Sequence, residues 1–219
     1  MTDTSLNKGK LYLFTSYTPG AGKTYLMLSK ALEEVEKGKR VSLGFINSNH
    51  RDISNLLLEH GVKTKINRNY HIKRILKNNP QLVVFDELGM SKVNKDNPER
   101  FVYEDVKELL EKGIDIYASA NLKRFSSLNP LYKQISGIGI RKTIPDYYLE
   151  MAEEIFLIDR RPELMQEDFN SRKLFSDKFN NSNIMRKNFT LEVLEQYRTL
   201  TYKILEKYKD KLTVVQRNN

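Results

Sequence analysis

The sequence contains no cysteine and no long run of apolar residues. The absence of cysteine excludes a disulfide scaffold, zinc or iron–sulfur sites with cysteine ligands, and thiol catalysis. Because no apolar stretch approaches the roughly 20 residues of a membrane helix, we expect neither a membrane span nor a signal peptide. The three histidines have no spacing typical of a metal site. We therefore expect a cytoplasmic protein.

The composition is polar and basic but still allows a core. Of the 219 residues, 39% are hydrophobic and 30% are charged, which suits one domain with a helical appendage. Lys and Arg total 37 against 28 Asp and Glu, which gives a net charge of +9. Such a charge attracts polyanions, yet the basic residues are spread along the chain and form no recognised nucleic-acid motif. Any nucleic-acid binding is therefore expected to be nonspecific and weakened by salt.

Short apolar runs alternate with longer amphipathic stretches, a pattern typical of α/β proteins with a mainly parallel sheet. Five strands are expected, at residues 11–16, 41–46, 82–85, 114–120 and 155–158. Helices are expected between them, at residues 23–37, 52–60, 71–77, 97–113 and 129–137. Residues 138–144 fit either an additional strand or an extended arm.

The β pattern ends near Pro162, and the remaining chain is predicted to contain C-terminal helices. Thr190 is typical of a helix N-cap, and an apolar stripe recurs at every third or fourth position from Leu194 to Tyr208. We expect this helix to pack on its own chain, with a partner-binding helix as the alternative. The predicted organisation is a nucleotide-binding domain over residues 1–161 and a helical extension over residues 162–219 that packs on or near it.

A glycine-rich turn after the first expected strand carries the strongest chemical signal. Glycines let successive backbone N–H groups curve around an anion, and a helix N-terminus adds unpaired N–H groups and its positive dipole end. Lys23 is expected to contact the β and γ phosphates, and Thr24 to ligate Mg²⁺. Tyr17 stands where the full Walker A pattern has glycine. The predicted nucleotide-binding residues of this segment are Pro19, Gly20, Ala21, Gly22, Lys23, Thr24 and Tyr25.

Two acids follow the apolar run at residues 82–85, at the strand end where α/β folds bind ligands. Asp86 is expected to hold Mg²⁺ through water, and Glu87 to polarise a water for attack on the γ-phosphate. The alternative for Glu87 is an ion pair with Lys92 or another base. Asn121, after the fourth strand, is a candidate γ-phosphate sensor or a turn residue. An Asp-Glu pair is typical of ATPases in which one strand separates the acid-bearing strand from the loop strand.

Several blocks of sequence occur in the order found in one known family. Residues 18–28 are similar to its Pro/Ala-Gly-Val-Gly-Lys-Thr-Tyr-x-Met-Leu, and residues 84–88 to its Val-Asp-Glu-Leu. Further similar blocks are at residues 105–117, 127–129, 135–137 and 144–146. Over about residues 9–187 the chain resembles the N-terminal cytoplasmic domain of KdpD, the osmosensitive potassium-channel sensor histidine kinase family.

The resemblance implies a P-loop NTPase-like three-layer sandwich with a five-stranded sheet. It also implies an ATP-binding regulatory module that reports to a protein partner in a potassium or turgor response of a two-component system. Three family blocks are altered, at residues 47–51, 89–92 and 121–124. The glycine-rich turn and both acids remain, so ATP and Mg²⁺ binding is expected with at most slow hydrolysis. The chain contains no histidine kinase core.

Two other function classes remain open. One is an enzyme proper, either an active P-loop ATPase or a small-molecule kinase, although no second pocket with a catalytic base is evident. The other is a nonspecific nucleic-acid-binding protein that relies on the net charge of +9.

Overall fold

A computed structural model describes residues 8–46, 55, 57–62, 70–91, 100–174 and 182–217. Its strands form one six-stranded sheet in the order β2-β3-β4-β1-β5-β6, and every neighbouring pair of strands is parallel. The strands are β1 (Leu11–Thr15), β2 (Val41–Leu43), β3 (Leu82–Phe85), β4 (Asp115–Ser119), β5 (Glu154–Arg160) and β6 (Leu212–Arg217). The α/β class and the parallel sheet are confirmed.

The sixth strand corrects the expected count of five. β6 follows the C-terminal helix and pairs with β5 along its whole length, from the Ile155–Leu212 pair to the Arg160–Arg217 pair. It lies at the edge of the sheet and none of its residues is fully buried, so it needs only a weak apolar pattern. The segment after Pro162 therefore adds a strand to the sheet as well as helices.

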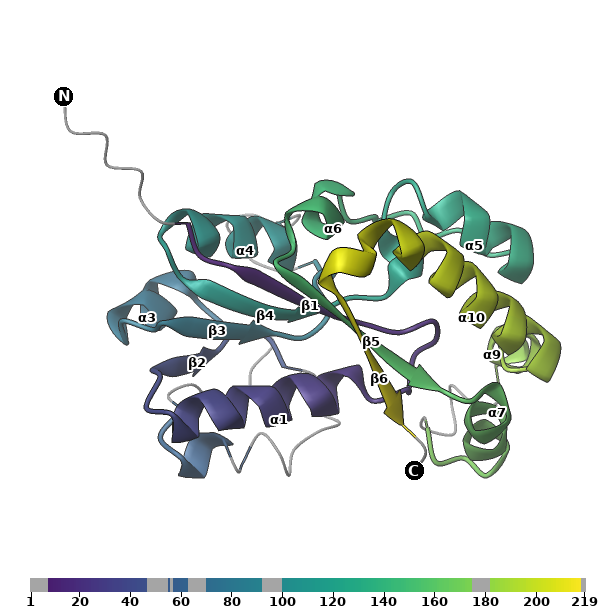
Figure 1. Ribbon diagram of the computed structural model, residues 1–219, viewed down its shortest axis with the longest axis horizontal. Coiled ribbons are helices and arrows are strands. Elements are labelled where there is room, and N and C mark those ends of the chain that lie inside the picture. The colour runs from purple at the N-terminus through teal and green to yellow at the C-terminus, as the bar shows by residue number, and fades with distance from the viewer. Residues whose placement is uncertain are drawn as a thin grey trace.

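Helices cover both faces of the sheet (Figure 1). Helix α1 (Lys23–Glu36) lies on one side, and α4 (Val102–Glu111), α6 (Tyr147–Met151) and α10 (Leu191–Leu205) lie on the other. The remaining helices are α3 (Ile72–Lys77), η2 (Leu122–Arg124), α5 (Asn129–Ser136), α7 (Pro162–Asn170), α9 (Asn183–Asn188) and η3 (Glu206–Lys211). None of the helices within the described ranges is long and apolar enough to span a bilayer.

Several expectations can be compared with these elements. Residues 138–144 do not form the additional strand: they are irregular, and Ile144 makes an isolated bridge with Phe125. Of the helix expected over residues 52–60, the structure describes residues 55 and 57–60, and the expected helix start at residues 97–98 lies outside the described residues. Thr190 caps α10 as predicted, because its hydroxyl accepts a hydrogen bond from the Val193 N–H.

The core lies between the central strands and the flanking helices. β3 is buried at all four positions, which matches its continuous apolar sequence and its central place in a parallel sheet. The stripe of α10 packs on its own chain: Leu194 is fully buried, and Thr201 shares a hydrogen bond with Tyr132 of α5.

Asp159 of β5 ties the C-terminal segment to the sheet. Its buried carboxylate accepts two hydrogen bonds from Arg198 of α10, at 2.8 and 2.6 Å. It also accepts one at 2.7 Å from the Tyr202 hydroxyl and one at 3.0 Å from the Gln216 amide of β6. Burial alone would raise the pKa of Asp159, but these donors outweigh it and hold that pKa below its usual value. Three of these hydrogen bonds therefore hold α10 against β5, and the fourth, from Gln216, holds β6 beside it.

Candidate functional site

The glycine loop, residues 17–22, joins β1 to α1 at the carboxyl edge of the sheet. Gly20 and Gly22 adopt φ values of 87° and 105°, in the left-handed region that favours glycine. Gly22 is the N-cap of α1, so the helix begins at Lys23. The strand–turn–helix order predicted from the sequence is therefore present, and Lys23 and Thr24 are buried at the start of the helix.

Tyr17 anchors the glycine loop where the Walker A pattern has its first glycine. It is 2% exposed, and its hydroxyl donates a hydrogen bond to the carbonyl of Arg160 at the end of β5. Among the described residues, positive φ occurs outside glycine at Asn79, Glu87 and Arg172, so the backbone at Tyr17 does not require glycine. Burial raises the pKa of the Tyr17 phenol, which keeps its proton available for this bond.

Lys23 rests on the glycine loop itself. Its Nζ donates a 3.2 Å hydrogen bond to the Ser16 hydroxyl, which in turn donates to the Thr18 carbonyl at 2.6 Å. The partner of the ammonium is thus a neutral hydroxyl, and the ion pairs of the described residues do not include Lys23. Its charge is therefore not neutralised by a neighbouring carboxylate.

The Asp86 carboxylate, at the end of β3, accepts hydrogen bonds from the start of α1 and from the end of β4. Its Oδ1 accepts a 2.9 Å hydrogen bond from the Thr24 hydroxyl of α1 and a 2.6 Å bond from the Ser119 hydroxyl of β4. The carboxylate is 2% exposed. β4 lies between β3, which leads to Asp86, and β1, which leads to the glycine loop. The predicted separation of these two strands by one strand is confirmed.

Glu87 has an unusual backbone. Its φ is 61°, a left-handed conformation that costs a non-glycine residue about 1 kcal/mol. The Glu87 N–H donates to the Ser119 hydroxyl at 3.0 Å, which holds this geometry. Its carboxylate forms a 3.8 Å ion pair with Arg124, and Arg124 also donates to the Gly89 carbonyl at 3.4 Å. Glu87 therefore forms an ion pair with a basic residue, which was the alternative predicted for it, and that residue is Arg124. Lys92, the other partner considered, lies outside the described residues.

Asn121 is placed by turn chemistry. Its side-chain oxygen accepts a 3.2 Å hydrogen bond from the Lys123 N–H and caps η2. A role for Asn121 as a phosphate sensor stays a prediction.

Lys123 is a site residue that the sequence reasoning missed. Burial lowers the pKa of its ammonium, and the charges of Arg124 and Lys23 lower it further, while Glu87 acts in the opposite direction. Lys123 lies in η2, directly after β4, and β4 runs between the strand that leads to Asp86 and the strand that leads to the glycine loop. The signal in the sequence was the basic pair at residues 123–124, where the resembled family has Gln-His.

Tyr25 and Arg217 form a second feature that no sequence pattern indicated. The Arg217 guanidinium lies over the Tyr25 ring, 4.6 Å from its centroid. The same guanidinium lies against the glycine loop: a Cβ placed on Gly22 would be only 1.8 Å from Arg217 Nη1. The contact was missed because β6 was not expected.

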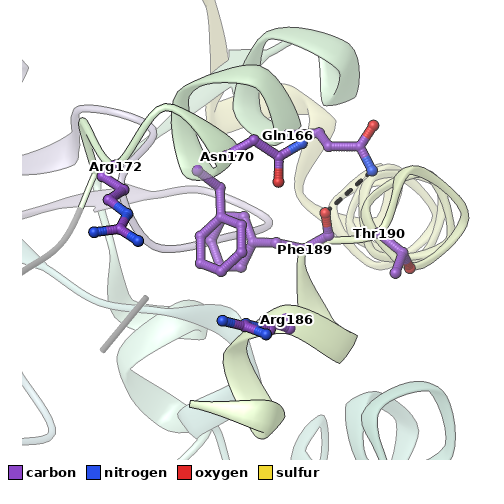
Figure 2. A pocket seen from close by; sticks show the side chains of 7 residues that line it. Gln166, Asn170, Arg172, Arg186, Phe189 and Thr190 are labelled. Atoms are coloured by element: carbon purple, nitrogen blue, oxygen red, sulfur yellow. Dashed lines mark hydrogen bonds between the residues drawn. The ribbon is translucent and has the colours of Figure 1, made fainter. Parts of the chain in front are cut away.

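A cavity of about 380 Å³ lies between α7, α9 and the start of α10 (Figure 2). Its lining residues are Gln166, Phe169, Asn170, Arg172, Arg186, Phe189 and Thr190. The rings of Phe169 and Phe189 stack at 4.5 Å, and Gln166 donates to the Phe189 carbonyl at 3.4 Å. None of these residues belongs to the site predicted from the sequence.

Among the described residues, no group of three or more His, Asp or Glu side chains is arranged to hold a metal ion. A divalent cation at Asp86 would have two adjacent protein oxygens, those of Thr24 and Asp86, which lie 2.9 Å apart. Mg²⁺ commonly takes one or two protein ligands and completes its shell with water and phosphate oxygens. The residues present therefore fit Mg²⁺ together with a phosphate ligand.

Comparison with known proteins gives consistent matches. Sensor protein KdpD of Clostridium acetobutylicum is 31% identical over 179 residues, which cover 77% of this chain and 20% of that protein. The putative sensor protein KdpD of Synechocystis sp. is 32% identical over 183 residues, 79% of this chain and 49% of that protein. Sensor protein KdpD of Escherichia coli is 29% identical over 179 residues, 77% of this chain and 20% of that protein.

The chain thus spans from one fifth to about half of the length of these relatives. A solved structure, the crystal structure of APE1195, has a low TM-score of 0.34 and 13% identity over 92% of this chain and 97% of that one. The fold assignment therefore rests on the sheet itself. The model of the family described as "Osmosensitive K+ channel His kinase sensor domain" matches residues 7–207 of this chain. This chain belongs to the KdpD sensor-domain family.

Proposed function

We propose that this chain is an ATP-binding regulatory module of a potassium- or turgor-responsive signalling system, and that it reports its nucleotide state to a protein partner. The observation that carries the proposal is the hydrogen bond between Thr24 and Asp86, beside the Lys23 ammonium. A Mg²⁺–triphosphate complex requires three groups that are present here. They are a hydroxyl at a helix start, a buried carboxylate at a strand end and a lysine on a glycine loop.

Each group would have a separate task. The backbone N–H groups of Gly20 and Gly22 and the start of α1 would bind phosphate oxygens. Lys23 would leave the Ser16 hydroxyl, a neutral partner at 3.2 Å, for a charged phosphate oxygen. Thr24 and Asp86 would hold Mg²⁺, which screens the phosphate charges when bound.

Signalling would pass through the loops that follow β3 and β4. Arg124 connects these loops, since it pairs with Glu87 and donates to the Gly89 carbonyl. A γ-phosphate near Lys123 and Arg124 would compete with Glu87 for these cations. The nucleotide would thereby favour one arrangement of the two loops, which is the differential interaction that a ligand-driven switch needs.

The direct test is calorimetry of the purified chain with ATP and Mg²⁺. We expect saturable binding, and Lys23→Ala should weaken it tenfold or more, because a charge-assisted hydrogen bond is lost. Lys37→Ala is a matched control: Lys37 follows the other end of α1 and is exposed in an ion pair with Glu34. Circular dichroism melting of both variants checks the fold. Absence of ATP binding to the unaltered chain would contradict the proposal.

The nucleic-acid alternative predicts a different result. Binding of a mixed oligonucleotide that disappears between low and physiological salt would be nonspecific attraction to the net positive charge. Such binding should be insensitive to Lys23→Ala, since Lys23 is 6% exposed and lies inside the site.

A further inference from the structure

Arg217, the last residue of β6, lies against the glycine loop although β6 is at the far edge of the sheet. Its guanidinium carbon is 4.6 Å from the centre of the Tyr25 ring, and Tyr25 is 47% exposed at the start of α1. Among the described residues, the ion pairs do not include Arg217. An arginine without an acidic partner therefore lies beside a loop whose backbone suits an anion.

The order of the strands shows on which side of the glycine loop Arg217 lies. Asp86 and Glu87 follow β3, which lies two strands from β1 in one direction, and Arg217 ends β6, which lies two strands from β1 in the other. Phosphates held between the glycine loop and Asp86 would fill the β3 side. The remainder of a nucleotide would then extend away from the acids, toward Tyr25 and Arg217.

We propose that Tyr25 and Arg217 form the subsite for the nucleoside part of the bound nucleotide, with the base stacking on the guanidinium and tyrosine pair. This inference rests on the function proposed above and adds the residues that recognise the nucleoside. Arginine is suited to the task because its planar guanidinium stacks on aromatic rings and bases and keeps its charge at every relevant pH.

The proposal has a consequence for specificity. Stacking uses the π-face that every base has, so a stacking subsite discriminates weakly between bases. We expect ATP and GTP to bind with affinities within a few-fold of each other. A nucleoside triphosphate should bind more tightly than inorganic tripolyphosphate, which has the phosphates without the base.

The position of β6 is held independently of any ligand. The neighbouring residue, Gln216, donates to the Asp159 carboxylate at 3.0 Å, and the strand pairs with β5 up to Arg217 itself. Substitution of Arg217 therefore leaves the docking of the strand in place. The family match ends at residue 207, so Arg217 lies beyond the segment that the family description covers.

The test compares Mg²⁺·ATP with Mg²⁺·tripolyphosphate by calorimetry, on the full chain and on Arg217→Ala, Arg217→Lys and Tyr25→Ala. Arg217→Ala should weaken ATP binding about tenfold and tripolyphosphate binding less than about twofold. Arg217→Lys should not restore ATP affinity, because lysine keeps the charge but not the planar stacking group. Val214→Ala, at an exposed position of the same strand, is the matched control and should bind both ligands as the unaltered chain does.

The possible results separate the two proposals. Equal affinity of the unaltered chain for ATP and tripolyphosphate would leave phosphate binding intact and overturn the nucleoside subsite. An equal loss for both ligands in Arg217→Ala, or full rescue by lysine, would assign Arg217 to the phosphates and also overturn it. Tighter ATP binding in Arg217→Ala would mean that Arg217 covers the site, and this too would overturn the nucleoside subsite. Binding of neither ligand to the unaltered chain would overturn both proposals.

Discussion

The Thr24 hydroxyl donates a 2.9 Å hydrogen bond to Asp86, which lies 62 positions further along the chain. The bond connects the first turn of α1 to the end of β3, and the intervening strand β4 contributes the Ser119 hydroxyl to the same carboxylate oxygen. Three elements therefore converge on one buried oxygen. That oxygen is the group which a divalent cation beside a phosphate would use.

Removal of the Thr24 hydroxyl should abolish most of the effect of Mg²⁺ on ATP affinity. Thr24→Val keeps the shape of the side chain but removes the hydroxyl that would ligate the ion and that donates to Asp86. Thr24→Ser retains the hydroxyl and is the matched control. Calorimetric titrations of ATP with Mg²⁺ and with a chelator give the ratio of the two ATP affinities. This ratio should be large for the unaltered chain and for Thr24→Ser, and near one for Thr24→Val. A preserved ratio in Thr24→Val would remove Thr24 from the metal site.

Replacement of Glu87 by glycine should separate turnover from stability. Glu87→Gly removes the carboxylate that would polarise water, so any slow release of phosphate from ATP should stop. The free energy of unfolding should stay level or rise by up to about 1 kcal/mol, because glycine relieves the left-handed backbone at φ 61°. Phosphate release and urea unfolding measure the two effects.

Glu87→Gln is the companion variant, since it keeps the backbone strain and the size of the side chain. It should also lose turnover, but without any gain in stability. A glutamine variant that releases phosphate at the original rate would show that Glu87 is not the catalytic base.

The sequence revealed those parts of the molecule that depend on local pattern. Residues 82–85 form a continuous apolar run, and central strands of parallel sheets are buried on both faces, so β3 and the acids after it were predictable. The separation of β3 from β1 by one strand followed from the Asp-Glu pair and is confirmed. The glycine loop was predictable because its glycines, lysine and threonine stand between a strand and a helix.

The parts that were missed depend on contacts between distant segments. β6 is an edge strand of exposed and half-buried residues, and its short apolar run from Leu212 to Val215 directly follows a stretch rich in charged residues. Without β6, Arg217 had no reason to be near Tyr25. The ion pair of Glu87 with Arg124 depends on η2, whose start is fixed by the Asn121 cap. Neither contact has a spacing in the sequence that predicts it.

Restoration of glycine at position 17 should destabilise the fold rather than improve the loop. Tyr17 is buried and its ring fills space beneath the loop, so Tyr17→Gly should lower the free energy of unfolding by about 4 kcal/mol. Tyr17→Phe removes only the hydrogen bond to the Arg160 carbonyl and should cost about 1 kcal/mol. Urea unfolding measures both, and ATP affinity of Tyr17→Phe should be close to that of the unaltered chain. A stable Tyr17→Gly variant would refute the anchoring role.

Asp159→Asn should weaken the attachment of the C-terminal segment and change its response to acid. The folded-state pKa of Asp159 lies below its usual value, so its contribution to stability is fully present above about pH 4 and is lost as the pH falls through the folded pKa. The asparagine variant should lose about 3 kcal/mol at pH 7, because the Arg198 charge remains without its partner. As the pH falls below 4 and then through the folded pKa of Asp159, the two proteins should converge in stability. Urea unfolding from pH 7 to pH 2.5 measures this, with Glu150→Gln, at an exposed ion pair with Lys207, as a control that should change little. Parallel pH curves for Asp159→Asn and the unaltered chain would show that Asp159 does not titrate as its hydrogen bonds indicate.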